Sequence, residues 1–208
     1  MAAPITHIVL AEKIFDKHFP KQDKKEFYVG TSFPDIRYLG VIDRNKTHFN
    51  ECNVKDVLEC DSSFMAGMKF HSLVDKVREK YMKKVNLYSL FPESQFLTQA
   101  VKVFEDKVLY GKVEDWGKVI HFFGDVDNDE LGFGVEEKDI LKWHNLLRYY
   151  FSQSVNESEF VQRFISGIGR PKEMADEMIR VLENVSDKDK ATKIVEDFYD
   201  NFEKLISG

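Results

Sequence analysis

Cysteine, proline and glycine are scarce in this chain of 208 residues, which contains two Cys, five Pro and 11 Gly. The two thiols, Cys52 and Cys60, can build neither a disulfide scaffold nor a four-cysteine zinc site. So few chain-breaking residues argue against a β-sandwich with many turns and favour long helices. Hydrophobic residues make up 43% of the chain and aromatic residues 13%, which excludes wholesale disorder and permits a sizeable core.

Long apolar runs and an excess of positive charge are also missing from the sequence. No stretch approaches the roughly 18 apolar residues of a membrane span, and residues 1–19 have no basic segment before their apolar residues, as a signal peptide would. The formal net charge of −6 does not suit an extended grip on a nucleic-acid backbone. We therefore expect a soluble, cytoplasmic protein with no transmembrane segment and no extended nucleic-acid surface.

Helix caps and hydrophobic periodicity recur along the chain and predict an all-α fold. The length suits one domain, so we expect a single bundle of about eight to nine helices over 1–208. The expected helices cover residues 6–19, 53–59, 62–84, 93–110, 113–123, 137–153, 157–166 with Asn156 as cap, 171–184 and 186–206. Residues 30–48 combine Gly, Pro, Asp and Asn and are expected to form an ordered loop, a common place for functional sites.

The helix expected over 62–84 has polar residues on its apolar face. At about 100° per residue, His71 and Asp75 lie close to Phe64, with Arg78 near them, whereas most of the lysines lie on a solvated side. An ionised carboxylate on an apolar face is costly unless it is paired or binds a metal. Because His71 lies one turn before Asp75, the two can form a core hydrogen bond or share one cation.

The first helix and the segment after it supply further candidates. His7 and His18 both face the apolar side of the helix over 6–19, and residues 30–48 contain Asp35 and His48. A lone inward His is usually a satisfied core residue, but His7, at a helix start, can be aimed at a neighbouring loop. Three imidazoles and two carboxylates without Cys suit Zn²⁺, Mn²⁺ or Fe and are typical of a catalytic site. The candidate ligands of one or two ions are therefore His7, Asp35, His48, His71 and Asp75.

At these residues the chain resembles the bacterial zinc-dependent phospholipases C and, more distantly, the HD-domain phosphohydrolases. The matching pieces, within about the first 80 residues, are Thr6-His7, Gly30…Pro34-Asp35, Arg44…Thr47-His48 and Gly67-x-x-x-His71-x-x-x-Asp75. The resemblance implies a phospholipase C/nuclease-like helical fold, with a metal-site half over about 1–125 and further C-terminal helices over about 137–208. It also implies that the five candidates bind active-site metals, whose activated water attacks a phosphodiester or phosphomonoester.

The resemblance implies two further features, of which the chain matches one. A later His with a carboxylate four residues on has its counterpart in His121 and Asp125, candidates for a second metal pair. On its predicted helix, however, His121 shares a side with Glu114 and Lys118. Secreted members of the family use a processed N-terminal Trp as a ligand, a residue that this sequence, which starts at Met1, does not have.

Two other patterns have competing interpretations. Asp125, Asp127 and Asp129 followed by Glu136 have the spacing of a calcium-binding EF-hand loop, but Glu130 stands where the sharp turn requires Gly. A solvated acidic turn is the simpler interpretation. His144 belongs to a helix that is apolar nearly all round, and we expect it to be a core histidine.

The expected function is metal-dependent hydrolysis of a phosphate ester, on a phosphorylated small molecule or a lipid-derived substrate. Asp35 or Asp75 would orient the attacking water, and Arg37 or Arg44 would neutralise charge on the phosphoryl oxygens, unless they only pair with surface carboxylates. A second enzymatic hypothesis keeps the metal but places nucleotides or a phosphopantetheine ester in the site. The alternative from another class is a non-catalytic helical interaction module whose His and Asp residues form a buried network or hold one structural ion.

Overall fold

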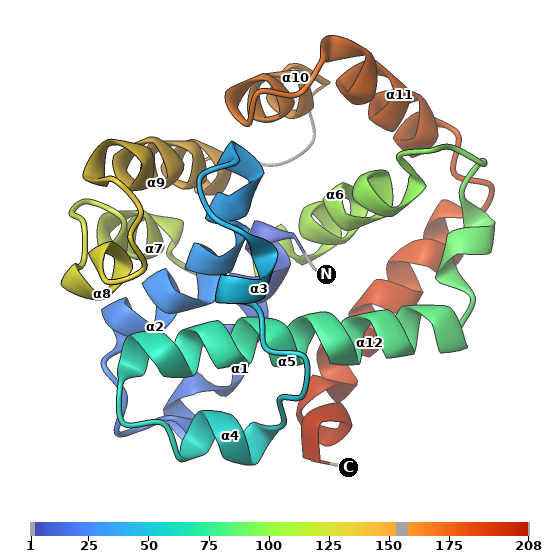
Figure 1. The fold of residues 1–208 in the computed structure, drawn as a ribbon. Helices are drawn as coiled ribbons and strands as arrows, with labels where there is room; N and C mark the ends of the chain where they lie inside the picture. Colours follow the sequence, from blue (N-terminus) through green and yellow to red (C-terminus); the bar gives the residue numbers. More distant parts are fainter. Residues whose placement is uncertain (1–2, 153–157, 208) are drawn as a thin grey trace.

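The hydrophobic periodicity is realised as helices throughout the computed structural model, which describes residues 3–152 and 158–207 (Figure 1). These described residues form one compact body of twelve α-helices and three 3₁₀ helices without a strand, so the all-α class is confirmed and the expected number of eight to nine helices is too low. The elements are α1 (Pro4–His18), α2 (Lys24–Ser32), η1 (Phe33–Leu39), α3 (Arg44–Thr47), α4 (Val54–Leu58), α5 (Ser63–Lys84), η2 (Leu87–Leu90), α6 (Leu97–Leu109), η3 (Tyr110–Lys112), α7 (Trp116–Phe122), α8 (Asn128–Leu131), α9 (Glu137–Phe151), α10 (Ser158–Gly167), α11 (Lys172–Glu183) and α12 (Lys188–Ser207).

The segment 30–48 is helical, and its assignment to a loop is wrong. Asp23 caps α2 by accepting a hydrogen bond from the Glu26 amide, and α2 continues through Ser32 directly into η1. Pro34 lies in the first turn of η1, where its missing N–H leaves no helical hydrogen bond unmade. Gly, Pro and Asp were therefore misleading signals, because each occupies a helical position that tolerates it.

Two glycines bring α2 and α5 into backbone contact. A Cβ added to Gly30 would overlap the carbonyl oxygen of Phe64, and one added to Gly67 would overlap that of Phe27. Only residues without a side chain permit this approach, which joins the two helices along most of the length of α2. The crossing lies one helical turn from His71 and a few residues before Asp35, so it determines how far apart these two side chains are.

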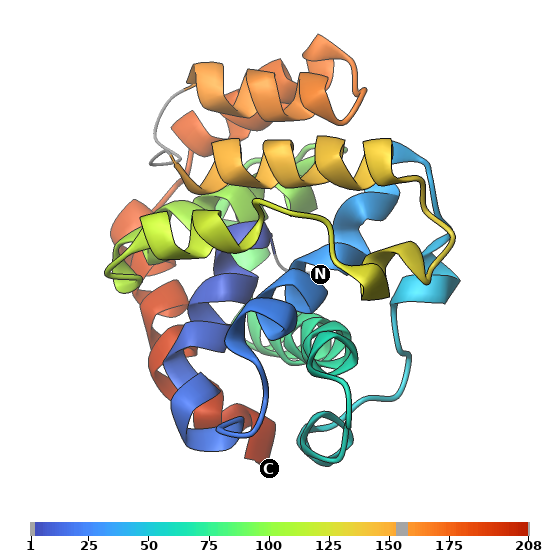
Figure 2. The same ribbon diagram turned by 90° about the vertical axis from the view of Figure 1, so that its left-hand side faces the viewer.

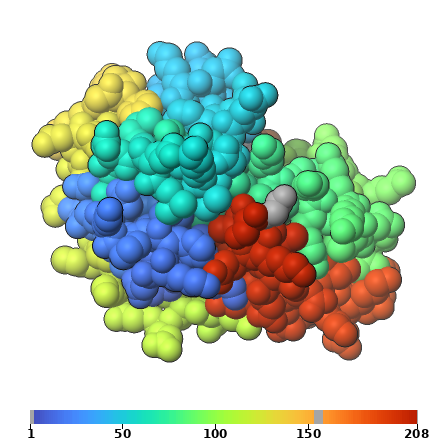
Figure 3. Space-filling view, turned by 90° about the horizontal axis from the view of Figure 1, so that it is seen from below, coloured from blue at the N-terminus to red at the C-terminus, as the bar shows by residue number. Residues whose placement is uncertain are grey.

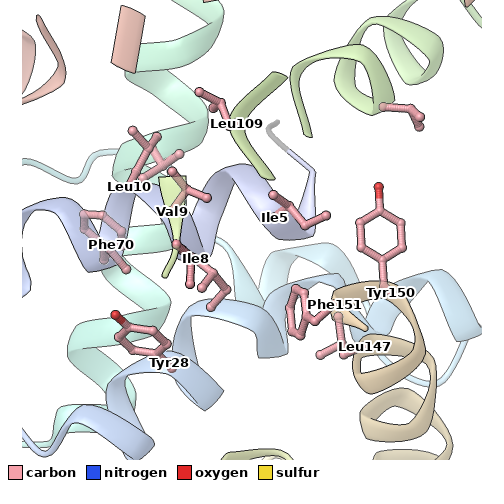
Figure 4. Close-up of a cluster of buried hydrophobic side chains, with 14 of the residues drawn as sticks. Ile5, Ile8, Val9, Leu10, Tyr28, Phe70, Leu109, Leu147, Tyr150 and Phe151 are labelled. Carbon is pink, nitrogen blue, oxygen red and sulfur yellow. The ribbon is translucent and has the colours of Figure 1, made fainter. Parts of the chain in front are cut away.

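Helix α1 lies within a cluster of buried hydrophobic side chains (Figure 4). Its residues Ile5, Ile8, Val9 and Leu10 are buried, and they pack among side chains of four other helices, Tyr28, Phe70, Leu109, Leu147, Tyr150 and Phe151. The helix begins at Pro4, two residues before the expected start at residue 6, and a carboxylate of α6 takes the place of a local cap. Asp106 accepts hydrogen bonds from the amides of Ile5 and Thr6, at 3.1 and 2.7 Å. This tie fixes the turn that presents His7.

The C-terminal helices α10, α11 and α12 pack against the outside of the helices that precede them. Helices α10 and α11 pack on each other and against α9 and α6 respectively, at the top of Figure 1. Helix α12 passes along α6, α5 and α1, and its buried residues Ala191, Val195, Phe198, Phe202 and Ile206 follow the expected helical spacing. Figure 2, turned by 90° from Figure 1, shows α9 lying above α7. Figure 3, seen from below, shows α12 against the N-terminal segments. The expected cap Asn156 lies outside the described residues.

None of the helices within 3–152 and 158–207 combines the length and the apolarity that crossing a membrane requires.

The α2–α5 crossing gives a first prediction. Gly67→Ala should lower the free energy of unfolding by about 3 kcal/mol, because the added methyl group has backbone and no mobile side chain beside it. Urea denaturation followed by circular dichroism measures the change. Gly111→Ala is the matched control, since nothing lies within 4 Å of its added Cβ and it should stay within about 0.5 kcal/mol of the wild type. Equal stabilities of the two variants would contradict the close crossing.

Candidate metal centre

Five buried residues from four segments of the chain converge between α1, η1 and α5. His7 comes from α1, Asp35 from η1, His48 from the end of α3, and His71 and Asp75 from α5. All five are buried, and even the most accessible, His48, is only 8% exposed. The structure therefore brings together the five residues that the sequence marked as candidate ligands.

Asp75 is the shared neighbour of the three histidines. Its Oδ1 lies 3.4 Å from His7 Nε2, and its Oδ2 lies 3.6 Å from His71 Nε2 and 3.9 Å from His48 Nε2. Two donors that each lie about 2.1 Å from a tetrahedral zinc ion are themselves about 3.4 Å apart. The spacing within the cluster is thus that of a ligand set around one small cation.

The five residues form two overlapping groups of three. One group is His7, His71 and Asp75, and the other is Asp35, His48 and His71; in each, one ligand atom per residue lies within 4.8 Å of the other two. The His7 and His71 rings stack at 3.9 Å, while the His48 ring is perpendicular to that of His71. His71 therefore stands at the middle of the cluster.

Hydrogen bonds behind the rings fix which nitrogen faces the centre. His7 Nδ1 lies 3.1 Å from the Ala3 carbonyl and His71 Nδ1 lies 2.9 Å from the Thr31 carbonyl. Since a carbonyl only accepts, each Nδ1 carries a hydrogen, and in a neutral imidazole Nε2 then presents a lone pair to the centre. Such an outer hydrogen bond is what orients and tunes histidine ligands at metal sites.

His48 is oriented in the same way through a hydroxyl group. Its Nδ1 lies 3.0 Å from Thr47 Oγ1, and that hydroxyl lies 3.3 Å from the carbonyl oxygens of Pro34 and Arg44. Because the hydroxyl proton goes to a carbonyl, Oγ1 accepts from His48 Nδ1–H. All three imidazoles consequently turn Nε2 toward Asp75.

The electrostatics keep His48 and His71 neutral and the central aspartate charged. Burial lowers the pKa of His48 to about 4 and, with the neighbouring His7, that of His71 to about 3. Burial alone would raise the pKa of Asp75, but its interactions with His71 and His7 outweigh this and hold it well below its usual range. These are the protonation states that a metal requires of its ligands.

Several ligand atoms are buried without a hydrogen bond within the described part of the chain. They are His7 Nε2, His48 Nε2, His71 Nε2 and Asp35 Oδ1. A buried polar atom left unsatisfied costs about 1–3 kcal/mol, so four in one place are rarely left so. A divalent cation would satisfy all of them, and the mixed N and O donors suit Zn²⁺ best, with Mn²⁺ or Fe as alternatives.

The two candidate arginines lie on different sides of the cluster. Arg37 Nη2 is 3.5 Å from Asp35 Oδ1, and the guanidinium stacks on the Tyr38 ring at 4.3 Å. Arg44 is exposed and, with His48 and Asp75, lines a surface pocket of about 250 Å³. The pocket gives the cluster an opening to solvent, which a closed structural metal site does not have.

His121 and Asp125, the candidate second metal pair, lie outside the cluster. Helix α7 ends at Phe122, so the pair does not share a helical face, and both residues are exposed. Asp127 and Glu130 of the EF-hand pattern form the capping box of α8. Glu130 is buried and accepts a 2.8 Å hydrogen bond from His144, which is a core histidine as expected.

His18 and Arg78, both marked as inward-facing, have partners elsewhere. His18 Nε2 lies 3.0 Å from a carboxylate oxygen of Glu203 on α12, at the edge of the core. Arg78 is fully buried and forms a bidentate ion pair with Glu105 of α6, which ties α5 to α6 one turn beyond Asp75.

Sequence reasoning missed Lys102 of α6. The side chain is 5% exposed, and burial lowers its pKa while the charges of Asp35 and Asp75 oppose this, so it lies within electrostatic range of the cluster. A signal was present, because Lys102 interrupts the apolar run Ala100-Val101-Lys102-Val103-Phe104.

The low pKa values of the buried histidines predict a pH effect on the metal-free protein. Below pH 6.5 the His71 imidazole takes up a proton in the unfolded chain, but in the folded chain it does so only near pH 3, so stability falls as the pH is lowered between these values. In EDTA, His71→Gln should reduce the slope of the unfolding free energy against pH by up to about 1.4 kcal/mol per pH unit. Urea denaturation from pH 7 to pH 4 measures it.

The matched control is His121→Gln, the same change at an exposed position. It should leave the wild-type slope unchanged. A wild-type slope in the His71→Gln protein would show that this histidine is not held neutral by burial.

Comparison with known proteins identified no relative of this chain. No protein-family model, no curated protein and no solved structure matches this chain. The interpretation of the centre therefore rests on the positions and the chemistry of its own residues.

Proposed function

We propose that this protein is a metal-dependent hydrolase of phosphate esters with a phospholipase C/nuclease-like fold. The observation that carries the proposal is the convergence of three histidine Nε2 atoms on the Asp75 carboxylate, beside Asp35, in a buried cluster that opens to a pocket. The resemblance of the ligand motifs to zinc-dependent phospholipases C supports phosphate ester hydrolysis as the reaction class.

The residues divide into holding and orienting roles. His7, His48, His71 and Asp75 would hold the ion, because their donor atoms face one another at 3.4–3.9 Å. A bound divalent ion supplies a nucleophile by lowering the pKa of its water toward about 7. Asp35 would accept a hydrogen bond from the attacking water, since its Oδ1 is buried without a hydrogen bond among the described residues.

The geometry favours one fully ligated ion. An imidazole nitrogen binds a single ion, and His71 Nε2 belongs to both groups of three. Asp75 is the residue that would bridge a second ion, because its two oxygens face different histidines.

The main test removes a ligand and measures both metal and turnover. We expect purified wild-type protein to retain about one Zn²⁺, or to take it up after loading, and to hydrolyse bis(p-nitrophenyl) phosphate or p-nitrophenyl phosphate. His71→Ala should lose the ion and reduce kcat/KM at least about 100-fold, comparable to the loss of an essential metal group. His121→Ala, with its exposed side chain, should match the wild type.

The possible outcomes separate the alternatives. Metal bound at His71 with no turnover on a panel of phosphate mono- and diesters, nucleotides and a phosphopantetheine ester would favour a structural ion in an interaction module. Failure of the wild type to bind any divalent ion would contradict the proposal.

Arg44 is the better placed of the two arginines to meet a phosphoryl oxygen. It lines the pocket beside His48 and Asp75, whereas Arg37 is engaged with Asp35 and Tyr38. Arg44→Gln should lower kcat/KM about 10- to 100-fold with the metal content unchanged, because an electrostatic contact to the transition state is lost. Lys46→Gln, the same loss of charge on exposed α3, is the control. Equal activities of the two variants would remove Arg44 from the site.

A further inference from the structure

A second cavity, of about 440 Å³, borders the metal centre at Asp35 and shares no lining residue with the pocket that Arg44 lines. It lies between the start of α1, η1, α6, α9 and the α10–α11 pair, elements that surround the upper middle of Figure 1. Its wall is largely apolar, and Asp35 of the cluster is part of it. The apolar lining includes Phe96, Val103, Phe164, Ile165, Ile168 and Met174.

Lys102 gives this apolar cavity a specific charge. It is 5% exposed, and within 3–152 and 158–207 it has neither an ion pair nor a hydrogen bond. The negative charges that act on it through space are those of Asp35, Asp75 and Glu105. Glu105 is paired with Arg78, and the other two carboxylates belong to the candidate metal centre, where a bound cation would offset their charge on Lys102.

The other charged groups in the wall leave the cavity positive. Arg170, from the turn between α10 and α11, is exposed at its rim. Tyr38 and Tyr150 also line the cavity; burial raises the pKa of both, so they are neutral, and Tyr150 hydrogen-bonds Asp106. Among the described residues that line the cavity, Asp35 is the one carboxylate. An apolar cavity with an unpaired, buried ammonium group is complementary to an anion that has an apolar substituent.

We propose that this cavity binds the apolar group of a small phosphate ester, and that Lys102 pairs with the negative charge of that ligand. As a statement about substrate class this rests on the proposed hydrolase function. The volume lies in the lower part of the range of small-molecule sites, so the ligand has one compact apolar group. The assignment gives the C-terminal helices α10 and α11 a role, since they form the outer wall of the site.

The test measures binding in the absence of metal, so that it does not depend on catalysis. Isothermal titration of the EDTA-treated full-length protein uses hexylphosphonate, which is not hydrolysed, with inorganic phosphate and hexyltrimethylammonium as comparison ligands. We expect hexylphosphonate to bind at least tenfold more tightly than phosphate, and the cationic ligand not to bind.

Variants of two lysines on α6 assign the charge. Lys102→Met should weaken hexylphosphonate binding at least tenfold, and Lys102→Arg should retain it within about threefold. Lys107→Met makes the same change at an exposed position outside the cavity and should match the wild type. Lys102→Met should also unfold at the same or a higher urea concentration, because a buried ammonium group without a partner is removed.

Hexylphosphonate binding no tighter than phosphate binding, or equal affinities of the wild type and folded Lys102→Met, would overturn the assignment. A marked loss of stability in Lys102→Met would likewise show that Lys102 is structural. Binding that depends on Lys102 in a protein that takes up no divalent ion would support the cavity assignment and contradict the hydrolase. Zn²⁺-dependent hydrolysis that Lys102→Met leaves unchanged would support the hydrolase and contradict the cavity assignment.

Discussion

The charge of Asp75 inside an otherwise apolar bundle is the constraint around which this structure is organised. Asp75 is 7% exposed, and its interactions with His71 and His7 hold its pKa well below its usual range. A charge in that position is expensive unless it is surrounded by compensating groups. Three histidines, oriented by Ala3, Thr31 and Thr47, turn their Nε2 atoms toward this carboxylate. A cation at the centre would bind these nitrogens and the carboxylate together.

The scaffold fixes the distances within the cluster through contacts that lie outside it. The Gly30–Gly67 crossing brings α2 against α5, so that the Thr31 carbonyl reaches His71. Asp106 fixes the start of α1, two residues before His7. Arg78 and Glu105 tie α5 to α6 one turn beyond Asp75. The ligands thus sit on rigid elements, which is the arrangement that precise metal sites need.

The sequence predicted the helices with clear caps and periodicity, and it predicted which polar side chains face inward. Ser62 and Asn53 cap α5 and α4 as expected, and His71 and Asp75 stood out because a helical period places them among apolar residues. It could not predict α2 and η1, because the reason for Gly30 is a backbone contact with Phe64, more than 30 residues away. His121 and Asp125 had the right spacing, but α7 ends between them, and a spacing has meaning only within one helix. Lys102 was missed because the burial of α6 depends on neighbours from the C-terminal half.

The most direct measurement of the central claim is anomalous diffraction at the zinc absorption edge from crystals of the full-length protein grown with Zn²⁺. We expect an anomalous peak about 2.0–2.2 Å from the Nε2 atoms of His7, His48 and His71 and from a carboxylate oxygen of Asp75. A cluster without any anomalous peak, or zinc bound only at other residues, would contradict it.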